Sequence, residues 1–176
     1  MPSPGAPTIA ELMDGCTRSA VHLEMRDQYG VAAEASDFQA WLETGRLDTD
    51  PASPDWAPWV GLVSRAVARG IAVRRARIVS EPVSDYIRYE HASTIVNVHA
   101  GEQVRWLPRR RASDIALPGN DFWLFDDQVI RWGYFSGNGA MVSHEVSEDP
   151  AAAKLCSEAF NAVWARAVPH DQYQIH

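Results

Sequence analysis

Apolar and polar side chains alternate along residues 17–27 of the chain. Val21, Leu23 and Met25 share one face of an extended strand, and the other face carries polar side chains, namely His22, Glu24 and Arg26. An alternation of period two predicts a strand that buries one of its two faces. A second strand is predicted over residues 71–79, directly after Gly70, which suits the end of a preceding helix.

Apolar side chains recur at helical spacing in several other segments. They predict a short helix over residues 8–16 and longer helices over 36–45, 56–69, 85–99 and from Asp149 onward. Three of the longer helices have a candidate N-cap. It is Ser36 for the helix at 36–45, Ser84 or Asp85 for the helix at 85–99, and Asp149 for the last helix.

Four short apolar segments in the second half of the chain predict strands over residues 103–107, 122–125, 129–135 and 141–146. The acidic pair Asp126-Asp127 suits a tight hairpin turn between two of them. The order of elements predicts an α/β fold in which one mixed β-sheet is flanked by helices. We expect its core to contain Trp41, Val73, Ile78, Leu124, Val129, Phe160 and Trp164.

Length and composition predict one folded unit. A chain of 176 residues with seven Trp and 46% hydrophobic residues has the apolar content for a full core, so we expect a disordered tail over 1–7 and a single α/β domain over 8–176. The net charge of -7 argues against direct nucleic-acid binding. Because the chain has neither a signal peptide nor a membrane-spanning apolar run, we expect a cytoplasmic protein without membrane contact. Cys16 and Cys156 are then expected as reduced thiols, with a disulfide between them as the alternative.

Residues 119–130 have the outline of a catalytic motif without its catalytic residues. The phospholipase D superfamily places a His, then a Lys two residues on, then an acidic residue five further on. With Asp126 at the acidic position, Gly119 and Asp121 fall at the His and Lys positions, and neither residue can act as the nucleophile or the phosphate clamp. Together with the element order from 71 to 168, the segment resembles one half of the phospholipase D fold. The resemblance implies a half-domain scaffold that lacks the catalytic His and Lys.

Four stretches look like an actinobacterial family that carries only a domain-of-unknown-function label. They are HLEMRD at 22–27, VSEPVSDYIRYEH at 79–91, AGEQVRWLPR at 100–109 and DFWLFD at 121–126. Members of that family are usually encoded beside helix-turn-helix regulators and small acidic proteins. The resemblance implies an accessory role in such a regulatory system, and it implies no catalytic residues.

A polar segment over residues 81–91 follows the strand at 71–79, at the sheet edge where open α/β sheets usually bind ligands. On the predicted helix Arg88 lies beside Asp85 and His91, and its guanidinium suits bidentate contact with an anionic group. The residues predicted to bind a ligand or partner are Glu81, Asp85, Tyr86, Arg88, Glu90, His91 and Arg105. The alternative is a capping role for Asp85 together with a surface Asp85–Arg88 pair.

Two further patterns bear on function. Arg105-Trp106 and Arg109-Arg110-Arg111 form a local basic patch that suits an acidic protein better than nucleic acid, because the surrounding charge is negative. A solvated loop is the alternative for this patch. The His residues lack the spacing of zinc ligands, so no metal site and no cofactor are predicted.

Two classes of function remain. The first is a non-catalytic ligand- or partner-binding protein, accessory to a transcriptional regulatory cluster, whose partner is a helix-turn-helix regulator, a small acidic protein or a small anionic ligand. The alternative is a small-molecule enzyme with a cleft of acid, base and Arg groups around Glu81, Asp85, His91 and Arg105. The missing catalytic His and Lys favour the first class.

Overall fold

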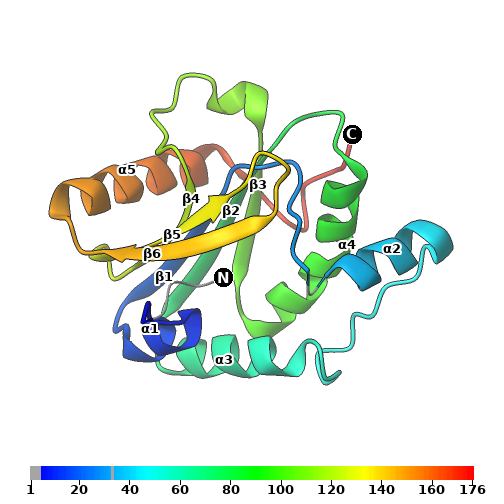
Figure 1. Ribbon diagram of the computed structural model, residues 1–176, viewed down its shortest axis with the longest axis horizontal. Helices are drawn as coiled ribbons and strands as arrows, with labels where there is room; N and C mark the ends of the chain where they lie inside the picture. Colours follow the sequence, from blue (N-terminus) through cyan, green and yellow to red (C-terminus); the bar gives the residue numbers. More distant parts are fainter. Residues whose placement is uncertain (1–4, 33) are drawn as a thin grey trace.

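A seven-stranded mixed β-sheet forms the centre of the protein in a computed structural model that describes residues 5–32 and 34–176 (Figure 1). The strand order across the sheet is β6-β5-β4-β1-β2-β3-β7. Strands β1, β2 and β3 run parallel to one another, and the other neighbouring pairs are antiparallel. The strands are β1 Ser19–Glu24, β2 Ala72–Val79, β3 Gln103–Pro108, β4 Asp121–Phe125, β5 Val129–Phe135, β6 Met141–Ser147 and β7 Val168–Pro169.

Helices cover both faces of this sheet. Helix α5 packs across one face, and α3 and α4 pack against the opposite face, with α1 beside α3 and α2 beside α4 (Figure 1). The helices are α1 Ile9–Gly15, α2 Ala35–Thr44, α3 Ala57–Ala68, α4 Asp85–Ala100 and α5 Pro150–Arg166, with a 3-10 helix at Arg109–Ala112. The predicted α/β fold with one mixed sheet is therefore confirmed.

Local signals fix several of these boundaries. The Ser84 hydroxyl accepts a hydrogen bond from the Ile87 backbone amide and caps α4, and Asp149 caps α5 with Pro150 as the first helical residue. Asp126 and Asp127 have φ values of 52° and 57°, and these left-handed residues are the centre of the turn that the Gln128 amide closes by donating to the Phe125 carbonyl at 3.0 Å. Ser36 lies inside α2, because Glu34 occupies the N-cap position and provides no side-chain cap.

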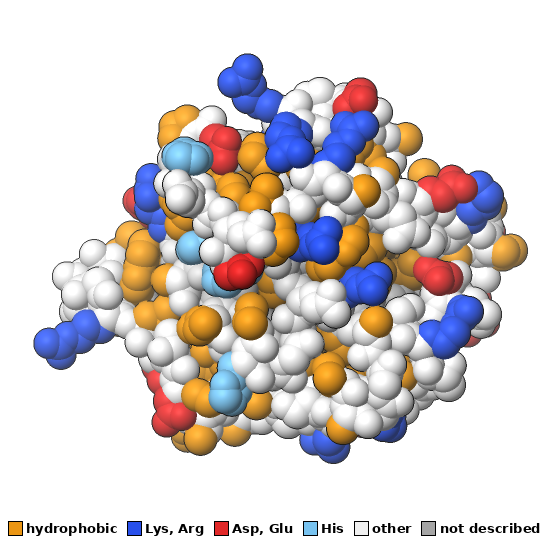
Figure 2. Space-filling model, turned by 180° about the vertical axis from the view of Figure 1, so that it is seen from behind, with side chains coloured by type: hydrophobic (Ala, Val, Ile, Leu, Met, Phe, Trp, Pro, Cys, Tyr) orange, Lys and Arg blue, Asp and Glu red, His pale blue; other side chains and the backbone are white. Residues whose placement is uncertain are grey.

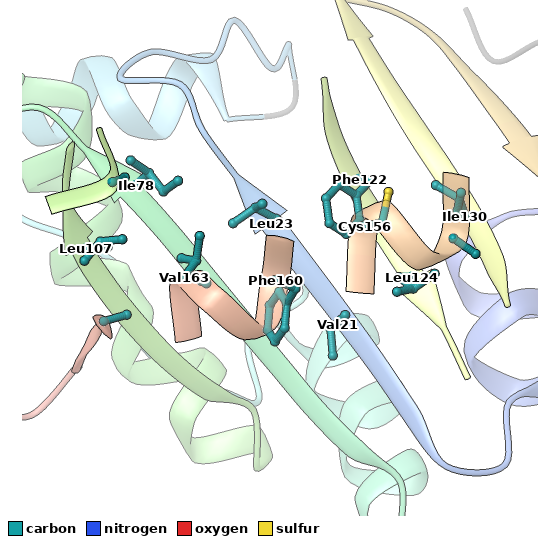
Figure 3. Close-up of a cluster of buried hydrophobic side chains, with 14 residues drawn as sticks. Val21, Leu23, Ile78, Leu107, Phe122, Leu124, Ile130, Cys156, Phe160 and Val163 are labelled. Atoms are coloured by element: carbon teal, nitrogen blue, oxygen red, sulfur yellow. The ribbon is translucent and has the colours of Figure 1, made fainter. Parts of the chain in front are cut away.

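The face covered by α5 is apolar. In this cluster Val163, Phe160 and Cys156 of α5 pack against side chains from the central strands, including Leu23 of β1 and Leu124 of β4 (Figure 3). Of the seven predicted core residues, four are buried, namely Val73, Ile78, Leu124 and Phe160, whereas Trp41, Val129 and Trp164 are partly exposed. The buried residues form three clusters and not the one expected core.

Charged side chains are dispersed over the surface. On the face seen from behind, Lys and Arg side chains lie among acidic, apolar and uncharged groups (Figure 2). Within the predicted basic patch, Arg110 and Arg111 are exposed, but Arg109 is engaged by the fold, since it donates to the Met25 carbonyl at 2.6 Å and to the Ser80 hydroxyl at 2.9 Å. This arginine links the ends of β1 and β2.

The N-terminal tail and the C-terminal segment were only partly predicted. Residues 1–4 of the predicted tail lie outside the described residues. At the other end, the Tyr173 ring is buried and stacks on Trp106, and the Val83 amide donates to the His176 carbonyl. The short strand β7 was not predicted. Cys16 and Cys156 are both buried and unpaired, and no helix in the described part of the chain is long and apolar enough to cross a bilayer.

Candidate ligand-binding cavity

A cavity of about 460 Å³ lies over the sheet face opposite α5. Its floor consists of side chains from β1, β2, β4, β5 and β6. Its walls come from α4, the start of α3 and the residues Tyr29, Val31 and Glu34. This volume is within the range of small-molecule sites.

Strand register arranges the floor in two rows. The first row crosses four neighbouring strands, β5, β4, β1 and β2. Its residues, in that order, are Arg131, Trp123, His22 and Arg75. The second row includes Glu24 opposite Arg77. Each of these residues points away from α5, because neighbouring residues such as Val21 and Leu23 point toward it.

Ion pairs hold two of the floor arginines. The Arg75 guanidinium contacts Glu102 at 2.6 Å and Glu24 at 3.1 Å, and the Arg77 guanidinium contacts Glu24 at 2.5 Å and Glu90 at 2.7 Å. Burial opposes ionisation of Glu24, but the two guanidinium groups outweigh it and hold the pKa of Glu24 well below its usual range. For Glu90 burial dominates and raises the pKa to about 7, although Arg77 acts in the opposite direction.

Two tyrosines bond to carboxyl groups at the cavity wall. The Tyr29 hydroxyl donates to Asp121, whose carboxyl also accepts from the Met25 amide at 3.0 Å. The Tyr86 hydroxyl donates to Glu34 at 2.8 Å. Burial raises the pKa of Asp121 to about 6 and raises that of Glu34 above its usual value. Several carboxyl groups of the cavity therefore hold their protons more tightly than exposed ones do.

Aromatic rings and unpaired polar atoms surround the first row of the floor. The His22 ring stacks on Trp123 with centroids 4.4 Å apart, and the Trp59 ring meets Trp123 edge-on at 5.9 Å. The Nδ1 atom of His22 and the Nε1 atom of Trp59 are both buried without a hydrogen-bond partner. Burial lowers the pKa of His22 to about 3, so the ring is neutral at physiological pH. Buried polar atoms without partners are rare in folded proteins. These two lie at the cavity, whereas others in the described part of the chain, such as Arg74 Nε and His91 Nε2, lie elsewhere in the fold.

The structure does not bring the seven predicted site residues together. Of these seven, Tyr86 and Glu90 line the cavity. Asp85 and Arg88 are exposed on the outer side of α4. The prediction that these residues face one common cleft was wrong for Asp85 and Arg88. On a helix, residues 85 and 88 point in a different direction from residues 86 and 90.

The remaining three residues contact other parts of the fold. Glu81 accepts a hydrogen bond from the Tyr173 hydroxyl at 2.8 Å, and the His91 ring packs against His170 with centroids 4.6 Å apart. Arg105 donates to the Trp164 carbonyl of α5 at 2.9 Å. Glu81 and His91 hold the C-terminal segment, and Arg105 holds α5.

Sequence reasoning missed most of the floor, above all His22, Glu24, Arg75, Arg77 and Arg131. Polar residues at every second position of β1 and β2 mark a polar face of the sheet, but this alternation does not distinguish an exposed face from a covered one. For β1 we expected these residues on an open face of the sheet. Burial of these residues could have been inferred from the position of β1. This strand is central in the sheet and has helices on both sides, so its polar face is covered.

The degenerate motif has a structural role at its acidic position. The Asp126 carboxylate accepts from the backbone amides of Thr17 at 2.8 Å, Arg18 at 2.7 Å and Ser19 at 3.0 Å. Burial of Asp126 is outweighed by these hydrogen bonds, which lower its pKa. Gly119 is exposed, whereas Asp121 lines the cavity. Among the described residues, no group of three or more His, Cys, Asp or Glu side chains is placed to hold a metal ion.

Comparison with solved structures finds two proteins to which this chain is similar in different degree. Nuc of Salmonella typhimurium, a phospholipase D family member, aligns with a TM-score of 0.52 at 12% identity, over 91% of this chain and 86% of that one. TrmBL2, an archaeal chromatin protein, aligns with a TM-score of 0.48 at 12% identity, over 90% of this chain and 47% of that one. At this identity the likeness to Nuc shows the fold alone, and it confirms the predicted phospholipase D-like architecture.

Comparison of sequences gives the family. No curated protein matches the chain. A family match extends over residues 7–175, nearly the whole sequence. The chain belongs to the family described as "Domain of unknown function (DUF6879)".

Proposed function

We propose that the protein is a non-catalytic small-molecule-binding protein that acts as an accessory to a transcriptional regulator. The observation that carries this proposal is the cavity of about 460 Å³, whose floor includes charged side chains and the unpaired Nδ1 of His22 and whose wall includes the unpaired Nε1 of Trp59. A fold that encloses unsatisfied polar atoms loses stability, unless a bound molecule satisfies them.

The non-catalytic part of the proposal rests on the motif residues. Gly119 and Asp121 occupy the positions at which the phospholipase D chemistry needs a nucleophile and a phosphate clamp. Asp126 is fully engaged by backbone amides. We therefore expect no hydrolysis of bis-p-nitrophenyl phosphate, DNA or phosphatidylcholine by the purified protein. Turnover that persists through repurification and disappears in Asp121→Asn would contradict this expectation.

The regulatory part rests on the family resemblance, which associates such chains with helix-turn-helix regulators and small acidic proteins. In this proposal the ligand occupies the cavity and changes how α4, which forms one of its walls, contacts such a regulator. The outer side of α4 presents Arg88, Ile95 and Val98 to solvent. Capture of the regulator should therefore depend on whether the cavity is filled.

Recovery of the ligand tests the central claim. Protein purified from its own organism is denatured, and the released small molecules are identified by mass spectrometry. Ser93 of α4 is buried and lines the cavity, so Ser93→Leu should fill part of it and abolish recovery. Ala92→Leu on the exposed side of the same helix is the matched control and should retain the ligand. Equal recovery from both variants, or no ligand from the wild type, refutes the proposal.

A second candidate is a small-molecule enzyme that uses this cavity. The specific observation in its favour is that burial raises the pKa of Glu90 to about 7 and that of Asp121 to about 6, values that suit general acid–base catalysis. It is tested by incubating the recovered molecule with the protein. Conversion that is lost in Glu90→Gln, in a variant that still binds the molecule, would favour the enzyme.

A further inference from the structure

Arg131 differs from the other arginines of the cavity floor. Arg75 and Arg77 are neutralised by carboxylates, but among the described residues no carboxylate forms an ion pair with Arg131. Its side chain is about nine-tenths buried, with 9% of the residue exposed, and its Nε donates to the Pro7 carbonyl at 3.3 Å. Burial alone lowers its pKa from the ordinary value. A buried guanidinium without an anion is an unfavourable arrangement for a protein without ligand.

Other groups around Arg131 suit an anion. Trp123 lies directly opposite Arg131 on the neighbouring strand, with His22 on its other side. The indole Nε1 of Trp59, which can only donate, is buried without a partner beside this row. His144 also lines the cavity, and burial together with the Arg131 charge lowers its pKa. An anion at Arg131 would neutralise the guanidinium, and the Trp59 indole N–H is a further unpaired donor of the same cavity.

From this geometry, and on the basis of the ligand-binding function proposed above, we infer that the ligand is a small aromatic carboxylic acid. Its carboxylate pairs with the Arg131 guanidinium, and its ring lies in the apolar part of the lining. A guanidinium presents two parallel N–H groups to a carboxylate, which gives direction as well as charge to the contact. The apolar remainder of the lining, including Phe135 and Met141, suits a ring better than a flexible polar chain.

The rest of the cavity discriminates against other ligand classes. A phosphate monoester would bring a second negative charge into a cavity that already contains the ionised Glu24, and Arg75 and Arg77 are already paired with carboxylates. A cationic ligand is disfavoured for another reason. The guanidinium of Arg75 already lies 5.7 Å from the ring centroids of both Trp59 and Trp123, and it occupies the position that a ligand cation would take over these rings.

Calorimetric titration of the full chain tests the ligand class. The probes are benzoate and indole-3-carboxylate, compared with benzamide, benzylamine and phenyl phosphate. The two carboxylates are expected to bind at least about 10-fold more tightly than the other probes, because each of these lacks the single negative charge that Arg131 selects. Tighter binding of benzylamine or phenyl phosphate, or no binding of either carboxylate at millimolar concentration, overturns the inference.

Substitution of Arg131 tests the residue. Arg131→Gln should weaken carboxylate binding about 10- to 100-fold. Because its charge is unpaired, the same substitution should leave the melting temperature of the ligand-free protein unchanged or raised. Arg131→Lys retains the charge without the planar fork and should lie between wild type and Arg131→Gln in affinity. Arg74→Gln, on the same sheet but packed against Trp164 on the α5 side, is the matched control and should bind as wild type does. Equal affinity in wild type and Arg131→Gln overturns the assignment of Arg131.

These results separate the inference from the proposed function. If a neutral or cationic molecule is recovered from the native protein and lost in Ser93→Leu, the protein binds ligands and the aromatic carboxylate inference is wrong. If nothing is recovered and no probe binds, both are wrong.

Discussion

The two faces of the β-sheet have opposite chemistry although the same strands form both. On the α5 side, Leu23, Leu124 and Phe160 pack without polar partners. On the other side the neighbouring residues of the same strands include His22, Glu24 and Trp123, which line a cavity. One face is filled by the fold itself, and the other face is enclosed but left with space. The difference indicates which face is for stability and which is for binding.

Energetics support this division. Apolar burial stabilises the fold by roughly 25 cal/mol per Å² removed from water. Buried ion pairs such as Arg77–Glu90 contribute little net stability, because desolvation cancels most of their attraction, yet loss of one partner is costly. A chain selected for stability alone gains more from apolar packing on both faces. We therefore interpret the ion-pair network as the support that holds the cavity floor in shape.

The α5 face should show the largest effect of a single truncation. Phe160 is 2% exposed and packs in the apolar cluster, so Phe160→Ala is expected to lower the free energy of unfolding by ~3–5 kcal/mol. Urea unfolding followed by circular dichroism measures this change. Leu155→Ala in the same helix removes a side chain that is 42% exposed and serves as the control, with a cost below about 1 kcal/mol. A Phe160→Ala protein as stable as its parent would mean that α5 does not hold the sheet.

The cavity face should respond to loss of charge. Glu24→Gln keeps the shape of the side chain but leaves Arg75 and Arg77 short of one carboxylate, and it should cost about 3 kcal/mol. Thermal and urea unfolding measure the loss. The exposed pair Lys154–Glu158 provides the control, and Lys154→Ala should cost less than about 0.5 kcal/mol. If the two substitutions have similar effects, the network does not support the floor.

The α5 face could be predicted from the sequence, and the reason is physical. Apolar residues at period two in the strands and at helical spacing in α5 have few other arrangements that bury them. Ile78, Leu124 and Phe160 were predicted as core and are buried on this face, whereas the predicted core residue Val73 is buried in the cluster on the opposite side of the sheet. The error concerned wide aromatic side chains such as Trp41 and Trp164, which pack at the rim of clusters with part of the ring exposed.

The cavity face could be predicted only in part. A polar residue on a strand gives the same alternation whether it meets solvent or an enclosed space, so His22 and Arg75 carried no signal of burial by themselves. Tyr86 and Glu90 were predicted because they belong to a helix start at the end of a strand. Arg88 was predicted by the same argument. Its position around the helix axis, however, directs it to solvent, whereas Tyr86 and Glu90 point toward the cavity.

A pH titration should distinguish the cavity face from the α5 face, which has no comparable groups. Burial raises the pKa of Glu90 to about 7, so the folded protein retains a proton that the unfolded chain, with a carboxyl pKa of roughly 4.3, has released. The stability that this proton contributes is present at low pH and is lost as the pH rises through about 7. Wild type should therefore lose about 1 kcal/mol between pH 6 and pH 7 relative to Glu90→Gln.

Thermal melts of wild type and Glu90→Gln across that interval measure the difference. Asp121 has a pKa of about 6 and contributes with the same sign, but it is present in both proteins and cancels. If Arg77 instead held Glu90 ionised throughout, the folded and unfolded carboxyl groups would both be deprotonated in this interval, and the stability difference between wild type and Glu90→Gln would stay constant from pH 6 to pH 7.

The smallest effect is expected outside both faces, at the outer side of α4. Arg88 is exposed and lies two residues from Tyr86 and Glu90, which line the cavity, so Arg88→Ala changes the helix without changing the cavity. Its free energy of unfolding should remain within about 0.5 kcal/mol of wild type, and its affinity for a cavity ligand should be unchanged. Calorimetric titration with the recovered ligand measures the affinity of Arg88→Ala. Glu90→Gln, whose side chain faces the cavity, is titrated for comparison. Lower affinity in Arg88→Ala would mean that the ligand extends past α4 to solvent. The outer side of α4 would then be part of the binding site, although in the structure it faces away from the cavity.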